Sequence, residues 1–108
     1  MSDTYSSENL KKLAKMGELA PQSMQAFQQF DRQAFAEGAL SVKSKELIAV
    51  AAAHITRCPF CIDAHVRRAK KAGATNQEIA ESIMVATAMN AGASLAHGAV
   101  AMESLEHP

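Results

Sequence analysis

The sequence has few aromatic residues for its length. Only 5% of its 108 residues are aromatic and tryptophan is absent, although 48% of the residues are hydrophobic and many of these are alanine. Small side chains fill a core only where helices approach one another closely, and a chain of this length buries a modest core on its own. We therefore expect closely packed helices and self-association.

The sequence also lacks an excess charge of either sign. Eleven lysines and arginines balance eleven aspartates and glutamates, which leaves no basic field to hold a phosphate backbone, so nucleic acid is not expected as a partner. The first twenty residues contain no apolar segment typical of a secretory signal, and no apolar run of about 18 residues is expected to cross a bilayer. We expect a cytoplasmic protein with no membrane partner.

Cysteine is scarce and concentrated. The two cysteines fall within four residues, Cys58-Pro59-Phe60-Cys61. A disulfide in a reducing compartment is more often catalytic or redox-sensing than structural. A cross-link that closes so short a loop also constrains the unfolded chain very little. Chemistry is therefore the better explanation of this spacing.

Strand signals are nearly absent, because β-branched runs are scarce and good helix formers dominate. Caps, prolines and glycines predict a single all-α domain over residues 1–108, a bundle of five to six helices. The expected helices start after Ser6 or Ser7 and run to Leu19, from Pro21 to Gly38, from a cap at Ser41 through His54, from Pro59 with Cys58 as cap to Gly73, and from a capping box at Thr75 and Glu78 through Met89. After a break at Gly92, a sixth helix is expected to extend to Leu105, with its glycines marking the break or close packing.

The candidate catalytic residues are Cys58, Cys61, His65 and Glu46. Spacings of three and four residues place the two sulfurs and the imidazole on one face of a helix, so that His65 can take or hold the proton of Cys61. A helix N-terminus or a nearby imidazolium lowers a thiol pKa. Glu46 lies on the preceding helix and can reach the same pocket if the intervening turn is tight. Such a dithiol cycles between thiol and disulfide, so no cofactor is expected.

Other interpretations of the C-x-x-C pattern remain open. Cys58, Cys61, His65 and either His54 or His97 would make a tetrahedral zinc set, in which case the protein would be a zinc-binding or oligomeric scaffold without catalysis. Buried structural cysteines are a third option. His54 is expected to be a hydrogen-bonded packing residue, and spacing alone does not place His97. The preceding alanine-rich helix argues against the βαβ setting of the glutaredoxin motif, and Ile62 stands where c-type haem attachment needs histidine.

The sequence resembles the carboxymuconolactone decarboxylase and alkylhydroperoxidase D family (AhpD-like) over about residues 21–105. The resemblance lies in the glutamate followed by C-x-x-C-x-x-x-H, here Glu46 to His65, and in the A-x-x-x-G-A-T-x-x-E-I pattern from Ala69 to Ile79. It implies an all-helical fold assembled as homo-oligomers, commonly trimers or hexamers, with active sites near subunit interfaces. It also implies that Cys61 is the peroxidatic cysteine, Cys58 the resolving one, and His65 with Glu46 a proton relay.

The function predicted from the residues and the resemblance together is a peroxidase-type oxidoreductase with peroxiredoxin activity, or a disulfide reductase. Its substrate would be a small hydroperoxide or disulfide, and an external dithiol or a redox protein would act as reductant. Pro59 and Phe60 stand where alkylhydroperoxidase D has a histidine inside the motif, so its particular reductant is not implied. The decarboxylase branch generally lacks the cysteine pair, so lactone decarboxylation is not expected.

Overall fold

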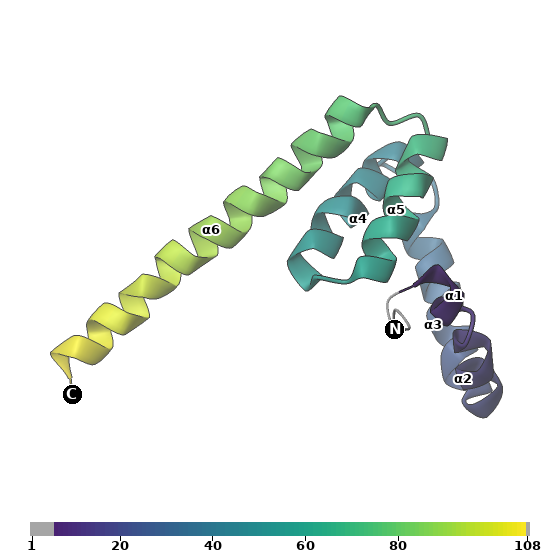
Figure 1. The fold of residues 1–108 in the computed structure, drawn as a ribbon, viewed down its shortest axis with the longest axis horizontal. Coiled ribbons are helices and arrows are strands. Elements are labelled where there is room, and N and C mark those ends of the chain that lie inside the picture. Colours follow the sequence, from purple (N-terminus) through teal and green to yellow (C-terminus); the bar gives the residue numbers. More distant parts are fainter. Residues whose placement is uncertain (1–5, 108) are drawn as a thin grey trace.

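The computed structural model of the protein describes residues 6–107, and within this range the chain forms helices and no strand (Figure 1). The helices are α1 (Ser7–Leu10), α2 (Leu13–Leu19), α3 (Pro21–Phe35), α4 (Val42–Thr56), α5 (Pro59–Lys71) and α6 (Asn76–Glu106). The prediction of an all-α fold is confirmed.

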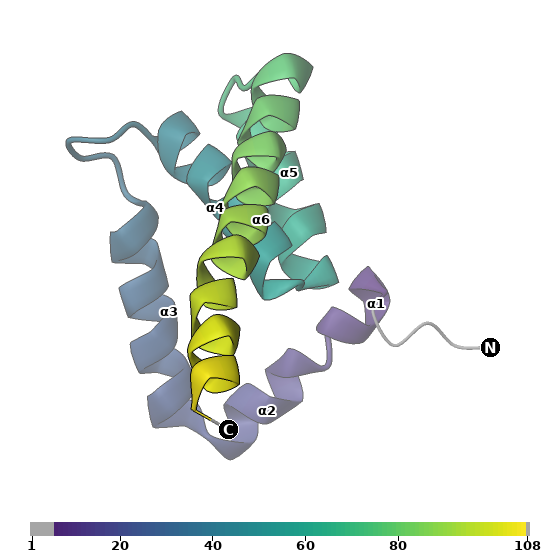
Figure 2. The same cartoon turned by 90° about the vertical axis from the view of Figure 1, so that its left-hand side faces the viewer.

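The central unit of the fold is the antiparallel pair α4 and α5, against which the first turns of α6 pack (Figures 1 and 2). Val50 and Ala69 are fully buried between these helices, and Ala74 and Ile79 complete the core cluster. Alanine at the contact lets two helices approach closely, as the composition predicts. Val50 is the largest fully buried side chain among the described residues, so one chain alone has a small core.

The helix starts follow the predicted caps. The Ser41 hydroxyl accepts the Ser44 N–H at 3.1 Å at the start of α4. At the start of α6 the Thr75 hydroxyl accepts the Glu78 N–H at 3.0 Å, and the Glu78 carboxylate accepts the Thr75 N–H at 2.9 Å. This reciprocal pair is a capping box, which satisfies two backbone donors that the helix itself leaves unpaired. Cys58 caps α5 in the same way through its sulfur.

The N-terminal half differs in two places from the sequence prediction. The expected first helix is split into α1 and α2, because the chain leaves the α-helical pattern at Lys11 and Lys12. The expected second helix ends at Phe35 and not at Gly38, since Ala36 adopts an extended conformation with ψ of 151°. The early end matters for function, because it leaves Phe35 as the last helical residue facing α4 and α5.

The predicted break at Gly92 is wrong. Helix α6 runs without interruption for 31 residues, from Asn76 to Glu106. A glycine inside a helix costs only about 1 kcal/mol relative to alanine, which neighbouring alanines and leucines can offset. Added Cβ atoms at Gly92 and Gly98 would meet nothing within 4 Å. Neither glycine is therefore required for close packing inside one chain.

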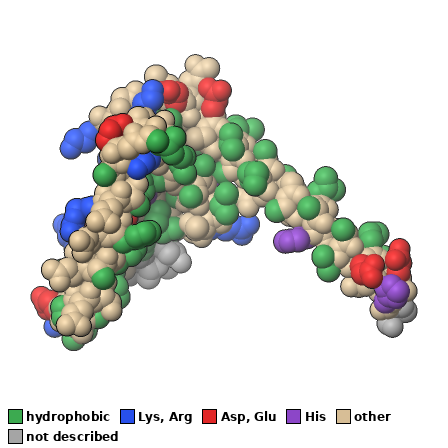
Figure 3. Space-filling view, turned by 180° about the vertical axis from the view of Figure 1, so that it is seen from behind, with side chains coloured by type: hydrophobic (Ala, Val, Ile, Leu, Met, Phe, Trp, Pro, Cys, Tyr) green, Lys and Arg blue, Asp and Glu red, His purple; other side chains and the backbone are tan. Residues whose placement is uncertain are grey.

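Helix α6 is long and apolar enough to cross a membrane when judged by length and composition alone, which the sequence analysis did not expect. Only 6% of its most apolar stretch is buried inside the chain. Its first turns pack against α4, whereas large apolar side chains further along, such as Leu95 and Leu105, are exposed. Figure 3 shows hydrophobic side chains along this projecting arm.

The chain as a whole is extended. Its radius of gyration is 18.0 Å, whereas a compact chain of this length has about 13 Å. Its accessible surface is 8364 Å², whereas a compact protein of the same mass exposes about 5,800 Å². The excess is spread over two arms, α2 with α3 on one side and the distal part of α6 on the other (Figures 1 and 2).

Candidate functional site

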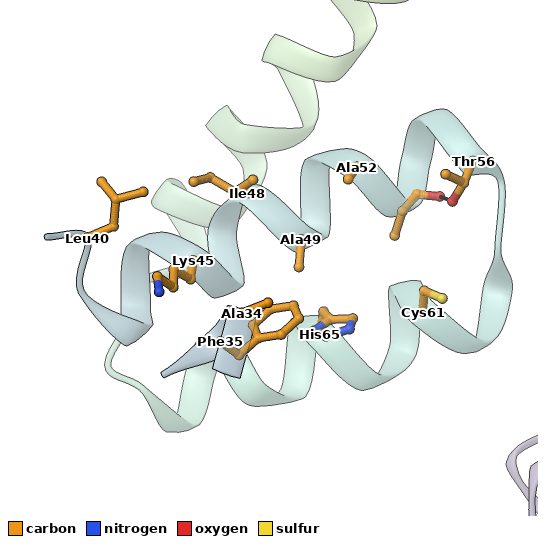
Figure 4. Close-up of a pocket in the computed structure, with 11 residues that line it drawn as sticks. Ala34, Phe35, Leu40, Lys45, Ile48, Ala49, Ala52, Thr56, Cys61 and His65 are labelled. Atoms are coloured by element: carbon orange, nitrogen blue, oxygen red, sulfur yellow. Dashed lines mark hydrogen bonds between the residues drawn. The ribbon is translucent and has the colours of Figure 1, made fainter. Parts of the chain in front are cut away.

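The site is a cavity of about 490 Å³ between α4, α5 and the end of α3, which we call the thiol cavity (Figure 4). Its polar groups belong to Cys61 and His65 on α5 and to Lys45 and Thr56 on α4. The rest of its lining is apolar and comes from Ala34, Phe35, Leu40, Ile48, Ala49, Ala52 and Ala53. A small number of polar groups in an apolar lining is typical of a ligand pocket.

His65 and Glu46 form a buried pair that joins α5 to α4. The Nδ1–H of His65 donates to Oε1 of Glu46 over 2.6 Å, and the two side chains are 15% and 6% exposed. A partner on Nδ1 fixes the orientation of the imidazole and leaves Nε2 to exchange a proton with a group in the cavity. The predicted contact between Glu46 and His65 is therefore present in the structure.

Phe35 packs against the face of the same imidazole. Its ring stacks on that of His65 with centroids 5.1 Å apart and planes inclined by 15° (Figure 4). The sequence analysis assigned Phe35 only to a helical apolar pattern and missed this contact. No local signal could have found it, since the two residues lie thirty positions apart in the chain.

The two cysteines are free thiols, both half-buried, and they have different surroundings. Cys58 lies at the N-cap of α5, where its Sγ accepts the backbone N–H of Cys61 over 3.3 Å. Hydrogen bonds from the Cys61 thiol, the Cys61 N–H and the Phe60 N–H hold the pKa of Cys58 below its ordinary value. The hydrogen bond to Cys58, with burial second, raises the pKa of Cys61 to about 11. Of the two thiols, Cys58 is therefore the one that loses its proton more readily.

The turn before Cys58 contains a strained residue. Arg57 has φ of 59° and is the one described residue other than glycine in the left-handed region, which is uncommon for a bulky side chain. It ends α4 as its C-cap and immediately precedes the N-cap of α5. This tight reversal allows Glu46 on α4 to face His65 on α5, and the sequence analysis did not anticipate it at an arginine.

A second contact that the sequence did not predict is made by Lys45, which lines the thiol cavity. The Nζ of Lys45 donates to the carbonyl oxygen of Ala36 over 2.5 Å. The bond ties the segment after α3 to α4, next to the position from which Phe35 reaches the imidazole. Both Lys45 and Phe35 therefore connect the N-terminal arm to the site.

The proposed zinc ligands do not converge. Among the described residues, the only three His, Cys, Asp or Glu side chains whose donor atoms lie within 4.8 Å of one another are Glu103, Glu106 and His107, an exposed group at the end of α6. His54 bonds through Nδ1 to the carbonyl of Val50 at 2.7 Å, which confirms the packing interpretation. His97 is exposed on α6 and does not line the thiol cavity.

The fold and the site together define a class: an all-α protein with a C-x-x-C pair at the start of one helix and a glutamate–histidine pair bridging to the helix before it. The chain belongs to the carboxymuconolactone decarboxylase family, whose model matches residues 21–104. The predicted family resemblance is confirmed.

A solved structure and two further protein sequences are similar to this chain. An apo crystal structure of a carboxymuconolactone decarboxylase family protein from Legionella pneumophila is 36% identical and superposes with a TM-score of 0.74, covering 97% of this chain and 96% of that one. "Uncharacterized protein 4 in cox locus" of Paracoccus denitrificans is 49% identical over 81 residues, which are 75% of this chain and 73% of that protein. An uncharacterized protein of Cupriavidus necator is 33% identical over 82 residues, 76% and 73% of the two chains.

Proposed function

We propose that this protein is a thiol-dependent oxidoreductase in which Cys58 and Cys61 alternate between dithiol and disulfide, with His65 and Glu46 transferring protons. One observation carries the proposal. Cys61 and His65 line a single apolar cavity, and the imidazole is fixed there by a 2.6 Å bond to a buried carboxylate. A structural cysteine would need no such group beside it.

The chemistry needs two electrons from the thiol pair. With a hydroperoxide, a thiolate attacks the terminal oxygen and the O–O bond breaks, so that a sulfenic acid forms and the departing alkoxide takes up a proton to become an alcohol; the second thiol then displaces water to give the disulfide. With a disulfide substrate, a thiolate attacks one sulfur, the substrate S–S bond breaks and one substrate thiolate leaves as the mixed disulfide forms; the second thiol then displaces the other substrate thiol. An external dithiol or redox protein, itself oxidised to a disulfide, restores both thiols.

We also propose that the working form is a homo-oligomer, for which a trimer or hexamer is the expectation from the family resemblance. The chain exposes more than about 2,000 Å² beyond a compact protein of its mass, while a standard interface takes about 800 Å² from each partner. The excess includes large apolar residues on both arms: Leu13, Met16, Leu19, Phe27, Phe30, Met84, Val85, Met89, Leu95, Val100, Met102 and Leu105. A second copy with the same two arms offers a matching apolar surface.

Thiol titration tests the redox proposal most directly. The fully reduced protein should show two reactive thiols under denaturing conditions, and treatment with one equivalent of hydroperoxide or of a small disulfide should remove both by forming an intramolecular disulfide. A Cys61→Ser variant should form no such bond and should not turn over with a dithiol reductant. Retention of both thiols with each oxidant would reject the proposal.

Metal analysis separates the redox enzyme from a zinc-binding scaffold. Protein purified without chelator should contain far less than one zinc per chain, and thiol-blocking reagents should release none. Stoichiometric zinc released by such reagents would favour the scaffold.

A further inference from the structure

We infer that the two sulfurs have a fixed order of reaction: Cys58 attacks first, on a disulfide substrate, and Cys61 is the resolving thiol that passes its proton to His65. The inference rests on the proposed thiol chemistry and selects one of its two substrate classes. It reverses the order of attack implied by the family resemblance, because the surroundings of the two sulfurs in this chain are unequal.

The geometry around Cys58 favours a thiolate. Its sulfur takes the place that a serine or aspartate oxygen takes at a helix N-cap, and the Cys61 N–H points at it over 3.3 Å. The Phe60 N–H contributes a further hydrogen bond. The N–H groups of a helix's first turn and the positive end of the helix dipole stabilise a negative charge there. Cys58 also lies outside the lining of the thiol cavity, so a partner need not enter the cavity to reach it.

The surroundings of Cys61 suit the second step. Its thiol is the harder of the two to deprotonate, since the hydrogen bond to Cys58 and its burial raise the pKa of Cys61 to about 11. A thiol of this kind is a poor first nucleophile at neutral pH and becomes useful only when a base removes its proton. His65 lines the same cavity one turn further along α5, and Glu46 behind it stabilises the imidazolium that would form.

This arrangement fits a disulfide better than a hydroperoxide. Reduction of a hydroperoxide needs a proton donor beside the attacking sulfur for the departing alkoxide, but the imidazole shares its cavity with Cys61 and not with Cys58. Attack on a disulfide needs only a thiolate, because the departing thiolate is stable without a proton. Each sulfur therefore has the surroundings that one step of thiol–disulfide exchange requires.

Cys58 thiolate attacks one sulfur of the substrate R–S–S–R, so that a Cys58–S–S–R bond forms and RS⁻ leaves. Cys61 loses its proton to His65 and attacks Cys58 Sγ, which forms the Cys58–Cys61 disulfide and expels the second RS⁻. The substrate gains two electrons and the pair loses them. The imidazolium then gives its proton to a departing thiolate or to solvent.

Competitive labelling tests the order in the unmodified pair. The fully reduced full-length protein is treated with substoichiometric iodoacetamide at neutral pH, and peptide mass spectrometry locates the label. Alkylation requires the thiolate, so Cys58 should carry about ten times more label than Cys61. Equal labelling, or a majority on Cys61, would overturn the inference.

An aromatic disulfide, 5,5′-dithiobis(2-nitrobenzoate), resolves the two steps by colour. The wild type should release two equivalents of thiolate, and Cys61→Ser should release one and retain a mixed disulfide on Cys58. His65→Ala should slow the second release about tenfold relative to the first, while the exposed control His97→Ala should slow neither. An unchanged second release in His65→Ala would mean that His65 does not take the proton of Cys61.

The Cys58→Ser variant tests the first step. Serine caps helices well, so this variant should fold, and it should react more slowly than Cys61→Ser.

The substrate class has its own test, and the two proposals fail separately. Oxidation of the reduced wild type by glutathione disulfide should be faster than by an equal concentration of cumene hydroperoxide, and the opposite result would overturn the preference for disulfides. If the wild type forms its internal disulfide but Cys61 is labelled first, only the order of attack is wrong. If no internal disulfide forms with either oxidant, the proposed function itself fails.

Discussion

Helix α4 and the distal half of α6 are made from similar alanine-rich sequence, but only α4, which pairs with α5, is packed. In the pair, Val50 and Ala69 are fully buried, and Glu46 is buried with a partner. On α6, Leu95 is 82% exposed and Leu105 is 72% exposed. Among the described residues no buried side-chain nitrogen or oxygen lacks a hydrogen-bond partner. Within one chain, therefore, the buried polar groups of the pair are satisfied, whereas the arms leave large apolar side chains exposed.

The largest expected effect is on the arms. Leu95→Glu should convert an assembly of 11.5 kDa chains into monomers in light scattering, because a carboxylate at the centre of an apolar contact is buried without a partner. Leu95→Met should leave the assembly intact, since it keeps an apolar side chain of similar volume. If the wild type is already monomeric at micromolar concentration, no second copy covers the arms, and the proposal that the arms form an interface is wrong.

The next effect is on the stability of the pair. Val50→Ala should lower the free energy of unfolding by about 2 kcal/mol, through lost burial and the cavity left behind. Ile48→Ala on the same helix is the control, because Ile48 is 55% exposed and lines the open cavity; it should cost less than about 1 kcal/mol. Urea unfolding measures both variants. Equal losses would mean that Ile48 is covered in the working protein.

A smaller free-energy change is expected at the site itself. Glu46→Gln should lower turnover with a dithiol reductant by on the order of tenfold, because the amide oxygen still accepts the His65 N–H but no longer offsets the charge of an imidazolium. Circular dichroism and unfolding should change little. The exposed Glu81→Gln on α6 serves as the matched charge control. Full turnover in Glu46→Gln would leave the glutamate with a role in packing alone.

The smallest effect is expected where α6 meets the pair. Hydrogen bonds from Thr75 and the ion pair with Lys43 at 2.9 Å hold the pKa of Glu78 below its ordinary value. A carboxyl with a lowered folded pKa stabilises the protein above its unfolded pKa of about 4.3, and this contribution is lost as the pH falls through the folded value. The difference in unfolding midpoint between wild type and Glu78→Gln should therefore be present at neutral pH and shrink in acid. If the difference does not depend on pH, it arises from replacing the carboxylate with an amide and not from the titration of Glu78.

The sequence predicted the parts of this fold that depend on neighbours a few residues apart. Thr75 with Glu78 and the cap at Cys58 are local contacts, and the spacing of Cys61 and His65 determines their common face once the helix forms. The His65–Glu46 contact was predictable because a tight turn leaves two helices little freedom. The redox roles of these residues stay predictions.

Other features depend on how segments far apart in the sequence come together, and sequence patterns could not predict them. The stack of Phe35 on His65 depends on the path of the chain from Ala36 to Ser41, which no periodicity describes. The prediction of a break at Gly92 was wrong because the free energy of a long helix is a sum over many residues, to which one glycine contributes little. The difference between the two sulfurs became visible only when their hydrogen bonds were known.

The unbroken course of α6 has a mechanical consequence. At 1.5 Å per residue its 31 residues form a rod about 46 Å long. A tilt of about five degrees at its Thr75 end would move its tip by about 4 Å, with no hinge at Gly92 to absorb the motion. Its first turns pack mainly on α4, which carries Glu46, so a movement of the tip would be transmitted to the helix pair that holds the site.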